Sequence, residues 1–216
     1  MHRLRADGEY PYQGGGVRMS GRSPRLISVT RSKLPHGYTE LSYIQGDGAS
    51  YINTGFNPNQ NTVVRADIAN DLSSVTRWIF GARNGTNVGA FGFLQYKGVY
   101  RADYGTATTN LHGTPTERFV IEMNKNSVKI DGAVIATASV QAFSTKYPIY
   151  LFANNNAGVS AGFSTTKIYG CEIYNGDVLM LEFIPCRRNS DNALGMYDTV
   201  HGTFYQNAGS GAFIGG

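Results

Sequence analysis

Short strand-like runs, separated by turn residues, follow one another from residue 34 to the end of the chain, and they constrain the fold more than any other feature. Many short strands between Gly, Asn and Asp turns favour an antiparallel sandwich or barrel. A helical period is absent, and the one stretch that permits a helical turn is Ala138–Ser144. We predict strands at Glu40–Ile44, Ser50–Thr54, Thr62–Ile68, Arg77–Ala82, Gly89–Gln95, Val99–Tyr104, Arg118–Asn124, Ser127–Asp131, Ala133–Thr137, Pro148–Ala153, Thr165–Tyr174, Val178–Pro185, Gly195–Thr199 and Thr203–Gln206.

Three tight turns support a meander of neighbouring strands. They are expected at Lys125-Asn126, Asp131-Gly132 and Asn175-Gly176, and each supplies residues that tolerate positive φ. The segment 127–136 alternates apolar and polar residues through the Asp-Gly turn. The composition agrees with strands, because 14 Tyr, 11 Phe and 27 Gly accompany a hydrophobic content of 41%. The chain therefore has enough apolar residues for a sizeable core.

The two cysteines, Cys171 and Cys186, flank the predicted Asn175-Gly176 hairpin. If Tyr174 faces Asp177 across that turn, then Cys171 faces Met180, and Cys186 lies well beyond its reach. Because bridged Cα atoms lie within about 7 Å of each other, a disulfide inside the hairpin is disfavoured. We expect free, partly buried thiols, as in proteins made in a reducing cytosol.

The surplus positive charge is confined to the first 33 residues. Residues 1–33 carry a net charge of +5 and the rest of the chain carries −1, so the pI of about 9.0 describes the N-terminal segment. That segment is too weakly hydrophobic to offset the entropy of ordering it, and it has no apolar core like that of a signal peptide. No apolar run approaches the roughly 18 residues of a membrane span. We interpret 1–33 as an extended basic attachment arm and 34–216 as one folded domain.

Several phrases of the sequence resemble a known domain type. The segment 127–136 is similar to the strand-turn-strand centre of laminin-G-like and concanavalin A-like jelly-roll domains. Segments 34–45, 50–56, 79–83, 100–105, 150–154, 183–186 and 195–198 resemble, in the expected order, such domains in phage and prophage virion proteins of gut Firmicutes. The resemblance covers nearly all of residues 34–216 and none of the arm. It implies an all-β, two-sheet antiparallel jelly-roll sandwich with a lectin-like character.

Catalytic patterns are missing from the sequence. Glucanases of this architecture place two carboxylates at alternate positions of one strand, and no such E-x-D-x-E cluster occurs here. Glu172 follows Cys171, Glu182 lies between Leu181 and Phe183, and Asp131 lies in a predicted turn, so none of them belongs to a cluster of carboxylates. The chain also has no Gly-x-Ser-x-Gly elbow, phosphate loop or His-Glu-x-x-His helix, and its four histidines are scattered. We therefore expect a protein that is not an enzyme.

Sugar binding needs an aromatic platform with amide or carboxylate groups around it. Two groups of residues could supply one, namely Trp78, Arg83, Asn84 and Asn87, and Tyr100, Asp103, Tyr104, Asn154, Asn155 and Asn156. The structural alternative is that Trp78 belongs to the core, the tyrosines form cross-strand pairs, and the Asn run is turn chemistry. Both interpretations stay open for the sequence alone.

Calcium is the one cofactor that the resemblance brings into view, because laminin-G-like domains often hold Ca²⁺ at a loop edge. The candidate ligands are Asp47, Asp103, Asp177, Asp191 and Asp198. No Asp-x-Asp-x-Asp loop groups them, so their interpretation as turn and capping residues is the stronger one. We predict no cofactor and no metal site.

The arm has three interpretations: docking on an acidic protein surface, contact with nucleic acid, or a solvated tail. Protein docking is favoured, because the rest of the chain offers no basic surface to extend a nucleic-acid path. The docking candidates are Arg3, Arg5, Tyr10, Tyr12, Arg18, Arg22, Arg25, Leu26, Ile27, Val29 and Arg31.

Together, the arm and the resemblance lead to the hypothesis of a non-enzymatic phage virion protein. It would be a capsid decoration or a tail-fibre component, docked on capsid or tail proteins in a symmetric assembly at the virion surface. The lectin-like domain would face outward and contact cell-surface or mucosal glycans. The alternative is a free carbohydrate-binding protein whose arm is a flexible linker, and a remnant glycosidase is third.

Overall fold

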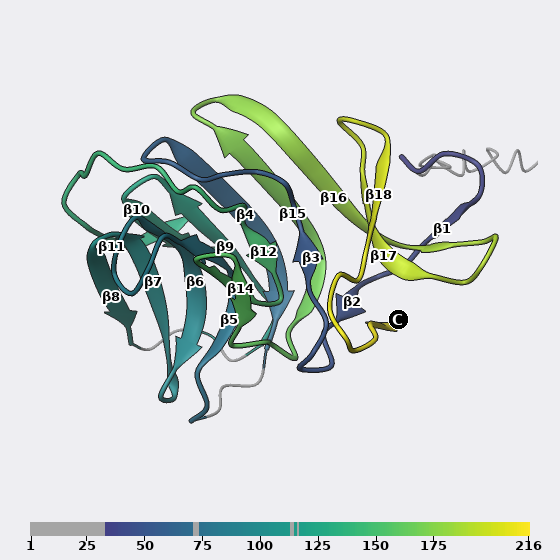
Figure 1. The fold of residues 1–216 in the computed structure, drawn as a ribbon, viewed down its shortest axis with the longest axis horizontal. Coiled ribbons are helices and arrows are strands. Elements are labelled where there is room, and N and C mark those ends of the chain that lie inside the picture. The colour runs from purple at the N-terminus through teal and green to yellow at the C-terminus, as the bar shows by residue number, and fades with distance from the viewer. Residues whose placement is uncertain (1–32, 71–73, 113–114, 116) are drawn as a thin grey trace, which may run out of the picture. The chain divides into compact units, whose positions relative to one another are not determined.

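The computed structural model describes residues 33–70, 74–112, 115 and 117–216, which form two β-sheets packed face to face (Figure 1). The predicted all-β sandwich is confirmed. The stretch Ala138–Ser144, which permits a helical turn, does not form one and is irregular apart from an isolated bridge between Asn59 and Ser144. Within the described ranges there is no helix that is long and apolar enough to cross a membrane. All the predicted docking residues of the arm lie outside the described residues.

One sheet, here called sheet A, has the strand order β11-β10-β9-β4-β15-β16-β17-β18. Strand β1 pairs with β16, and β2 pairs with both β15 and β19. In Figure 1 the long β15–β16 ribbon runs past the C-terminal strands β17 and β18. The strands of sheet A are β1 (Tyr38–Glu40), β2 (Ile44–Gln45), β4 (Thr62–Ala69), β9 (Phe119–Asn124), β10 (Ser127–Ile130), β11 (Ala133–Thr137), β15 (Lys167–Asn175), β16 (Val178–Arg188), β17 (Leu194–Asp198), β18 (Thr203–Gln206) and β19 (Ile214–Gly215).

The other sheet, sheet B, has the order β14-β13-β5-β6-β7-β8, with β12 joining β5 to β3. Its pairings are antiparallel except for β13 with β5, which is parallel. The strands of sheet B are β3 (Ile52–Asn53), β5 (Arg77–Arg83), β6 (Ala90–Tyr96), β7 (Val99–Gly105), β8 (Ala107–Leu111), β12 (Tyr150–Leu151), β13 (Asn154–Asn156) and β14 (Val159–Ala161).

The core lies between the two sheets and is rich in aromatic rings. Phe80, Phe93 and Tyr100 of sheet B are fully buried, and Phe119 of sheet A meets the Tyr100 ring edge-on at 5.4 Å between centroids. The Phe93 and Tyr100 rings stack at 5.1 Å. Burying side chains of this size contributes roughly 1.5–3 kcal/mol each. These aromatic residues therefore hold the sheets together.

The predicted turns at Lys125-Asn126 and Asp131-Gly132 are confirmed, and the turn predicted at Asn175-Gly176 is displaced. Asp131 and Gly132 have φ values of 48° and 82°, which is the type I′ geometry that an Asp-Gly hairpin predicts. In the β15–β16 hairpin Asn175 pairs with Val178, so the central turn residues are Gly176 and Asp177, one position later than predicted. A bulge after Ile173 shifts the register further, so Cys171 faces Phe183 and not Met180.

Both cysteines are free and buried, as the sequence predicts. Burial raises the pKa of the Cys171 thiol strongly and raises the pKa of Cys186 to about 12. Both are therefore thiols, not thiolates, at neutral pH, and we assign them a packing role.

Candidate functional site

Trp78 lies on the outer face of sheet B, away from the core. The bulge in β5 between Trp78 and Phe80 lets Ile79 and Phe80 both join the core. Gly81 and Gly92 face outward, because their strand neighbours belong to the core and their missing Cβ positions point at the indole. Trp78 is 4% exposed. The predicted platform residue is thus neither a core residue nor an open platform, but a ring laid against the outside of the sheet.

Three glycines make room for the indole. A Cβ on Gly81 would lie 2.5 Å from Cε3 of Trp78, a Cβ on Gly92 would lie 2.8 Å from Cζ3, and a Cβ on Gly162 would lie 2.6 Å from Cδ1. Cβ atoms do not approach other atoms this closely, so any side chain at these positions would displace the ring. The glycines therefore fix where Trp78 lies.

Two arginines flank the indole. The Arg83 guanidinium lies 5.5 Å from the Trp78 ring centroid, and its Nε donates to Oδ1 of Asn156 at 2.9 Å. Arg101 binds Asp103 through two hydrogen bonds, Nε to Oδ1 at 2.7 Å and Nη2 to Oδ2 at 3.0 Å. Arg101 also lies 4.8 Å from the ring of Tyr96. Strands β5, β6, β7 and β13 therefore bring one aromatic and cationic group together on a single face.

The two arginines differ in their electrostatic surroundings. The pKa of Arg83 is lowered, first by burial and then by the opposing effects of Asp103, which raises it, and Arg101, which lowers it further. The hydrogen bond to Asp103 raises the pKa of Arg101. Asp103 is 1% exposed and gives both carboxylate oxygens to Arg101. Arg101 therefore has a counter-ion, whereas Arg83 has an amide partner.

A hollow of about 280 Å³ opens beside these groups, which is close to the lower end of the size range for small-ligand pockets. Its lining includes the aromatic rings of Trp78 and Tyr96, the amide of Asn87 and the two guanidinium groups. We call it the Trp78 hollow. It is lined by Thr76, Trp78, Arg83, Thr86, Asn87, Leu94, Tyr96 and Arg101.

The structure partly unites the two predicted groups of sugar-binding residues. Asn156 holds Arg83, and Asp103 holds Arg101, so members of both groups support the Trp78 hollow. Asn87 lines it as the sequence suggests, but Asn84 bonds the backbone of Ser144 and Lys146.

Other candidates are buried and do not line the Trp78 hollow. Tyr100 and Tyr104 belong to the core, so the interpretation as cross-strand packing residues describes them. Asn155 binds the carbonyl of Pro148 and the amide of Gly158, which is turn chemistry. Asn154 is fully buried, and within the described residues neither atom of its amide has a hydrogen-bond partner.

Sequence reasoning missed five residues of the lining, namely Thr76, Thr86, Leu94, Tyr96 and Arg101. A usable signal was present in Lys97-Gly98, a two-residue turn whose φ values are 51° and 84°. This turn pairs Tyr96 with Val99 and Leu94 with Arg101. Because residues in direct register share a face, counting back from this turn would have placed Leu94 and Arg101 side by side.

The aspartates that were considered for calcium have other partners. Asp47 accepts from the backbone of Ala49 and Ala212, and Asp191 binds Arg188, which lowers the pKa of Asp191 to about 2. Within the described ranges, no group of three or more His, Cys, Asp or Glu side chains is placed to hold a metal ion. The remaining candidates lie apart: Asp103 is bound to Arg101, Asp177 is in the β15–β16 turn, and Asp198 accepts from the backbone of Glu182 and Val200.

Two carboxylates that the sequence treats as isolated are neighbours in the structure. Glu172 on β15 lies in direct register with Glu182 on β16, on the outer face of sheet A. A glycosidase acid needs a raised pKa. The pKa of Glu182 is instead lowered, by hydrogen bonds from Lys33 and Thr199. Glu182 is therefore a stable carboxylate and is unsuited to act as a general acid.

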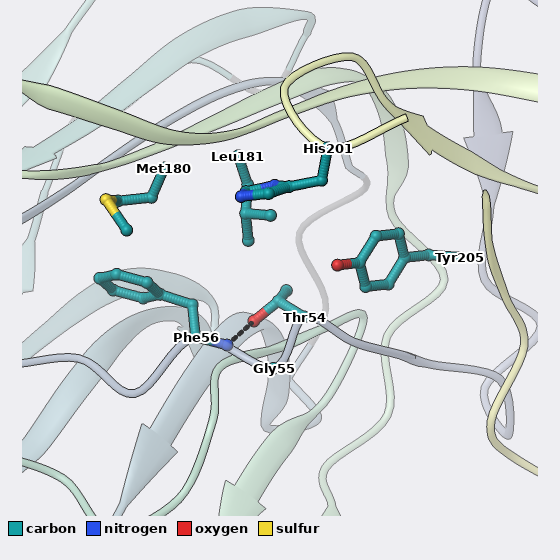
Figure 2. Close-up of a pocket in the computed structure, with 7 residues that line it drawn as sticks. All are labelled: Thr54, Gly55, Phe56, Met180, Leu181, His201 and Tyr205. Carbon is teal, nitrogen blue, oxygen red and sulfur yellow. Dashed lines mark hydrogen bonds between the residues drawn. The ribbon is translucent and has the colours of Figure 1, made fainter. Parts of the chain in front are cut away.

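A second hollow, also of about 280 Å³, lies between the segment after β3 and strands β16 and β18 (Figure 2). Phe56 and Met180 lie on one side of it and Tyr205 on the other. The Thr54 hydroxyl donates to the carbonyl of Ile149 and accepts from the amide of Phe56, so it is engaged in the fold. His201 lines this hollow, with Nδ1 2.7 Å from Oδ2 of buried Asp198.

No protein-family model and no curated protein sequence matches the chain. Its fold is similar to that of a proposed carbohydrate-binding protein from Bacteroides ovatus, with a TM-score of 0.57 and 9% identity over 82% of this chain and 60% of that one. A sialidase from Trypanosoma rangeli, in complex with 2,3-difluorosialic acid, aligns with a TM-score of 0.45 and 17% identity over 63% of this chain and 25% of that one. The chain spans less than two thirds of the length of either protein. The first likeness shows a shared β-sandwich fold.

Proposed function

We propose that the chain is a non-enzymatic, carbohydrate-binding β-sandwich and that the Trp78 hollow is its ligand site. The observation that carries the proposal is the combination of aromatic rings, an amide and guanidinium groups around one hollow on an open sheet face. The half-buried Tyr96 ring would cover an apolar patch of a sugar, with the buried Trp78 ring forming the wall beside it, and the amide and guanidinium groups would bond the sugar hydroxyls. The fold likeness to the Bacteroides ovatus protein supports this assignment at the level of architecture.

Tyr96 gives the cleanest test, because it is half-buried and sheet A offers a matched control. Tyr96 has the Arg101 guanidinium 4.8 Å from its ring centroid, and Tyr169 on sheet A has that of Arg118 at 3.7 Å. A glycan panel screened with the full chain identifies ligands, and calorimetry measures their affinity. We expect Tyr96→Ala to weaken binding about tenfold or more and Tyr169→Ala to leave it unchanged. Equal losses in both variants, or no glycan bound by the unmodified chain, would contradict the proposal.

A finer proposal is that this domain is displayed on a phage virion and anchored there by residues 1–33. It rests on the sequence resemblance and on the net charge of +5 in that segment, against −1 in the rest. We expect the full chain, but not a variant that begins at Leu34, to co-sediment with virion shells or tails that lack this protein. Added salt should weaken the association, because exposed charge interactions are screened. Equal sedimentation of both forms, or of neither, argues for the alternative of a free lectin-like protein.

A further inference from the structure

The charged side chains that line the Trp78 hollow are both cationic. They are Arg83 and Arg101, and Lys97 lies 5.3 Å from the ring of Tyr96, which also lines the hollow. The carboxylate in contact with this group is that of Asp103, and both of its oxygens are taken by Arg101. The hollow therefore presents a positive field to a ligand.

Arg83 is the cation whose bonding is incomplete. Its Nε donates to Asn156, and its terminal Nη1 and Nη2 groups make no hydrogen bond or ion pair within the described residues. The side chain is half-buried against the Trp78 ring, and burial lowers its pKa. Asp103 acts on Arg83 from a distance and raises its pKa, but the described residues give Arg83 no direct ion pair. A half-buried cation without such a pair is costly, and a planar carboxylate matches the two terminal groups of a guanidinium. An incoming carboxylate would thus complete the bonding of Arg83.

The remaining lining suits a sugar ring more than a bare anion. Thr76, Thr86 and Asn87 are exposed and offer hydroxyl and amide groups, and Tyr96 offers a ring face. A small inorganic anion would contact few of these groups in a hollow of about 280 Å³. A monosaccharide unit that carries a carboxylate would use both the guanidinium and the polar rim.

We infer that the ligand of the Trp78 hollow is an acidic sugar, and that Arg83 binds its carboxylate through Nη1 and Nη2. This inference rests on the proposed carbohydrate-binding function. Asn156 then acts as a positioning residue, because its bond to Nε sets the orientation of the guanidinium. Arg101 keeps its hydrogen bonds to Asp103 and contributes to the positive electrostatic potential of the hollow more than to direct contact with the ligand.

The test compares two ligands that differ only at the acidic group. The full chain is titrated by calorimetry with a tetrasaccharide of galacturonic acid and with the galactose tetrasaccharide made by reducing its carboxyl groups. Charge-assisted hydrogen bonds contribute about 1.5–3 kcal/mol, so we expect the acidic form to bind about tenfold tighter or more. The preference should shrink as salt is added. Arg83→Met should abolish it, Arg83→Lys should keep part of it, and Arg118→Met on sheet A should not change it.

The controls separate the inference from the proposed function. Equal or tighter binding of the neutral tetrasaccharide overturns the acidic-sugar inference and leaves carbohydrate binding intact. A sulfated galactose tetrasaccharide that binds tighter than the carboxylated one also overturns it, as does acetate that competes at the concentration of the sugar. If neither these ligands nor any member of a broad glycan panel binds, the proposed function itself fails. Circular dichroism of Arg83→Lys and Arg83→Met establishes that both variants are folded.

Discussion

The outer faces of the two sheets carry the same ion pair in different surroundings. On sheet B, Arg101 binds Asp103 through two hydrogen bonds, and the side chains are 15% and 1% exposed. On sheet A, Arg118 binds Asp67 through the same two-pronged geometry, and the side chains are 55% and 30% exposed. The pair on sheet B is built into a packed surface with Trp78, whereas the pair on sheet A remains solvated. The same bonding geometry is therefore buried on one face and solvated on the other.

The rest of each face also differs. On sheet A, one row of residues lies in register across β10, β9, β4, β15 and β16. Its members alternate between positive and negative charge, except that the last two are both glutamates. They are Lys129, Glu122, Arg65, Glu172 and Glu182. On sheet B, the row in register with Asn154 is Gly81, Gly92 and Asp103. This charge ladder on sheet A is mostly half-buried, and part of it lines a hollow of about 270 Å³, in which the cation Arg65 already lies in register with the carboxylates of Glu122 and Glu172. On sheet B a glycine floor lies under the indole. The Arg83 guanidinium beside the indole has only an amide partner among the described residues, and for this reason we propose the ligand site there.

The largest expected difference between the faces concerns stability. Arg101→Met leaves Asp103 buried without its counter-ion, and such a change typically costs about 3–5 kcal/mol. Arg118→Met leaves Asp67 solvated and should cost at most about 1 kcal/mol. Urea unfolding of both variants measures the contrast. Similar losses in the two variants would show that the burial difference between the faces is not energetically important.

The glycine floor gives the next contrast. Gly81→Ala places a Cβ 2.5 Å from Trp78, so the ring must move, at a cost of about 1–3 kcal/mol. The matched change on sheet A is Gly170→Ala, whose nearest contact would be 3.7 Å away and whose effect should stay within about 0.5 kcal/mol. Trp78 is the chain's only tryptophan, so its fluorescence reports the displacement directly. An unchanged emission maximum in Gly81→Ala would mean that the floor does not set the ring position.

Asn154 tests whether sheet B gives up stability for its polar groups. A buried amide without partners costs about 1–3 kcal/mol, and leucine has a similar volume. Asn154→Leu should therefore stabilise the fold by about that amount, as measured by thermal and urea unfolding. Destabilisation would reveal that the amide has a partner, such as an ordered water, that offsets its burial.

The smallest effect is expected in the charge ladder of sheet A. A hydrogen bond from Lys129 lowers the pKa of Glu122 in the folded state, against the opposing effect of burial. A depressed folded-state pKa contributes stability above the unfolded value of about 4.5, and this contribution is lost as pH falls through the folded value. The free energy of unfolding is measured from about pH 6 to about pH 3, which spans the usual carboxyl pKa range. It should fall less steeply with pH in Glu122→Gln than in the unmodified chain. The difference in free energy of unfolding should stay within about 1 kcal/mol. The same pH dependence in both proteins would show that the Glu122–Lys129 pair does not contribute to the loss of stability in acid.

Alternation and turn chemistry made the sandwich predictable, but not every strand of it. Residues 107–111 and 159–161 form β8 and β14, which the sequence does not predict because each segment is short and has only one large apolar side chain, Leu111 or Val159. The Asn run 154–156 looks like a turn, and it pairs as β13 because neighbouring strands supply the bonds that its composition does not favour. The predicted strand at Glu40–Ile44 is instead two short strands, β1 and β2, paired with β16 and β15 respectively.

The residue types that line the Trp78 hollow could be predicted in part from the sequence, but the geometry that brings them together could not. Trp78, Arg83 and Asn87 stand out as residue types, and the structure places all three in the lining of the Trp78 hollow. The placement of Trp78 depends on a bulge in β5 and on glycines from two other segments, and neither has a local sequence signal. Tyr100 and Tyr104 point inward because β7 alternates, which the sequence shows only once the turn at Lys97-Gly98 fixes the register.

The most direct measurement is a titration of glycans followed by Trp78 fluorescence, because the single tryptophan lies in the wall of the proposed site. We expect a saturable change in emission with the ligands that calorimetry detects, shifted to about tenfold higher ligand concentration or more in Tyr96→Ala and unshifted in Tyr169→Ala. Glycan binding with an unchanged Trp78 emission, or with the same response in both variants, would contradict the assignment of the ligand site to this face.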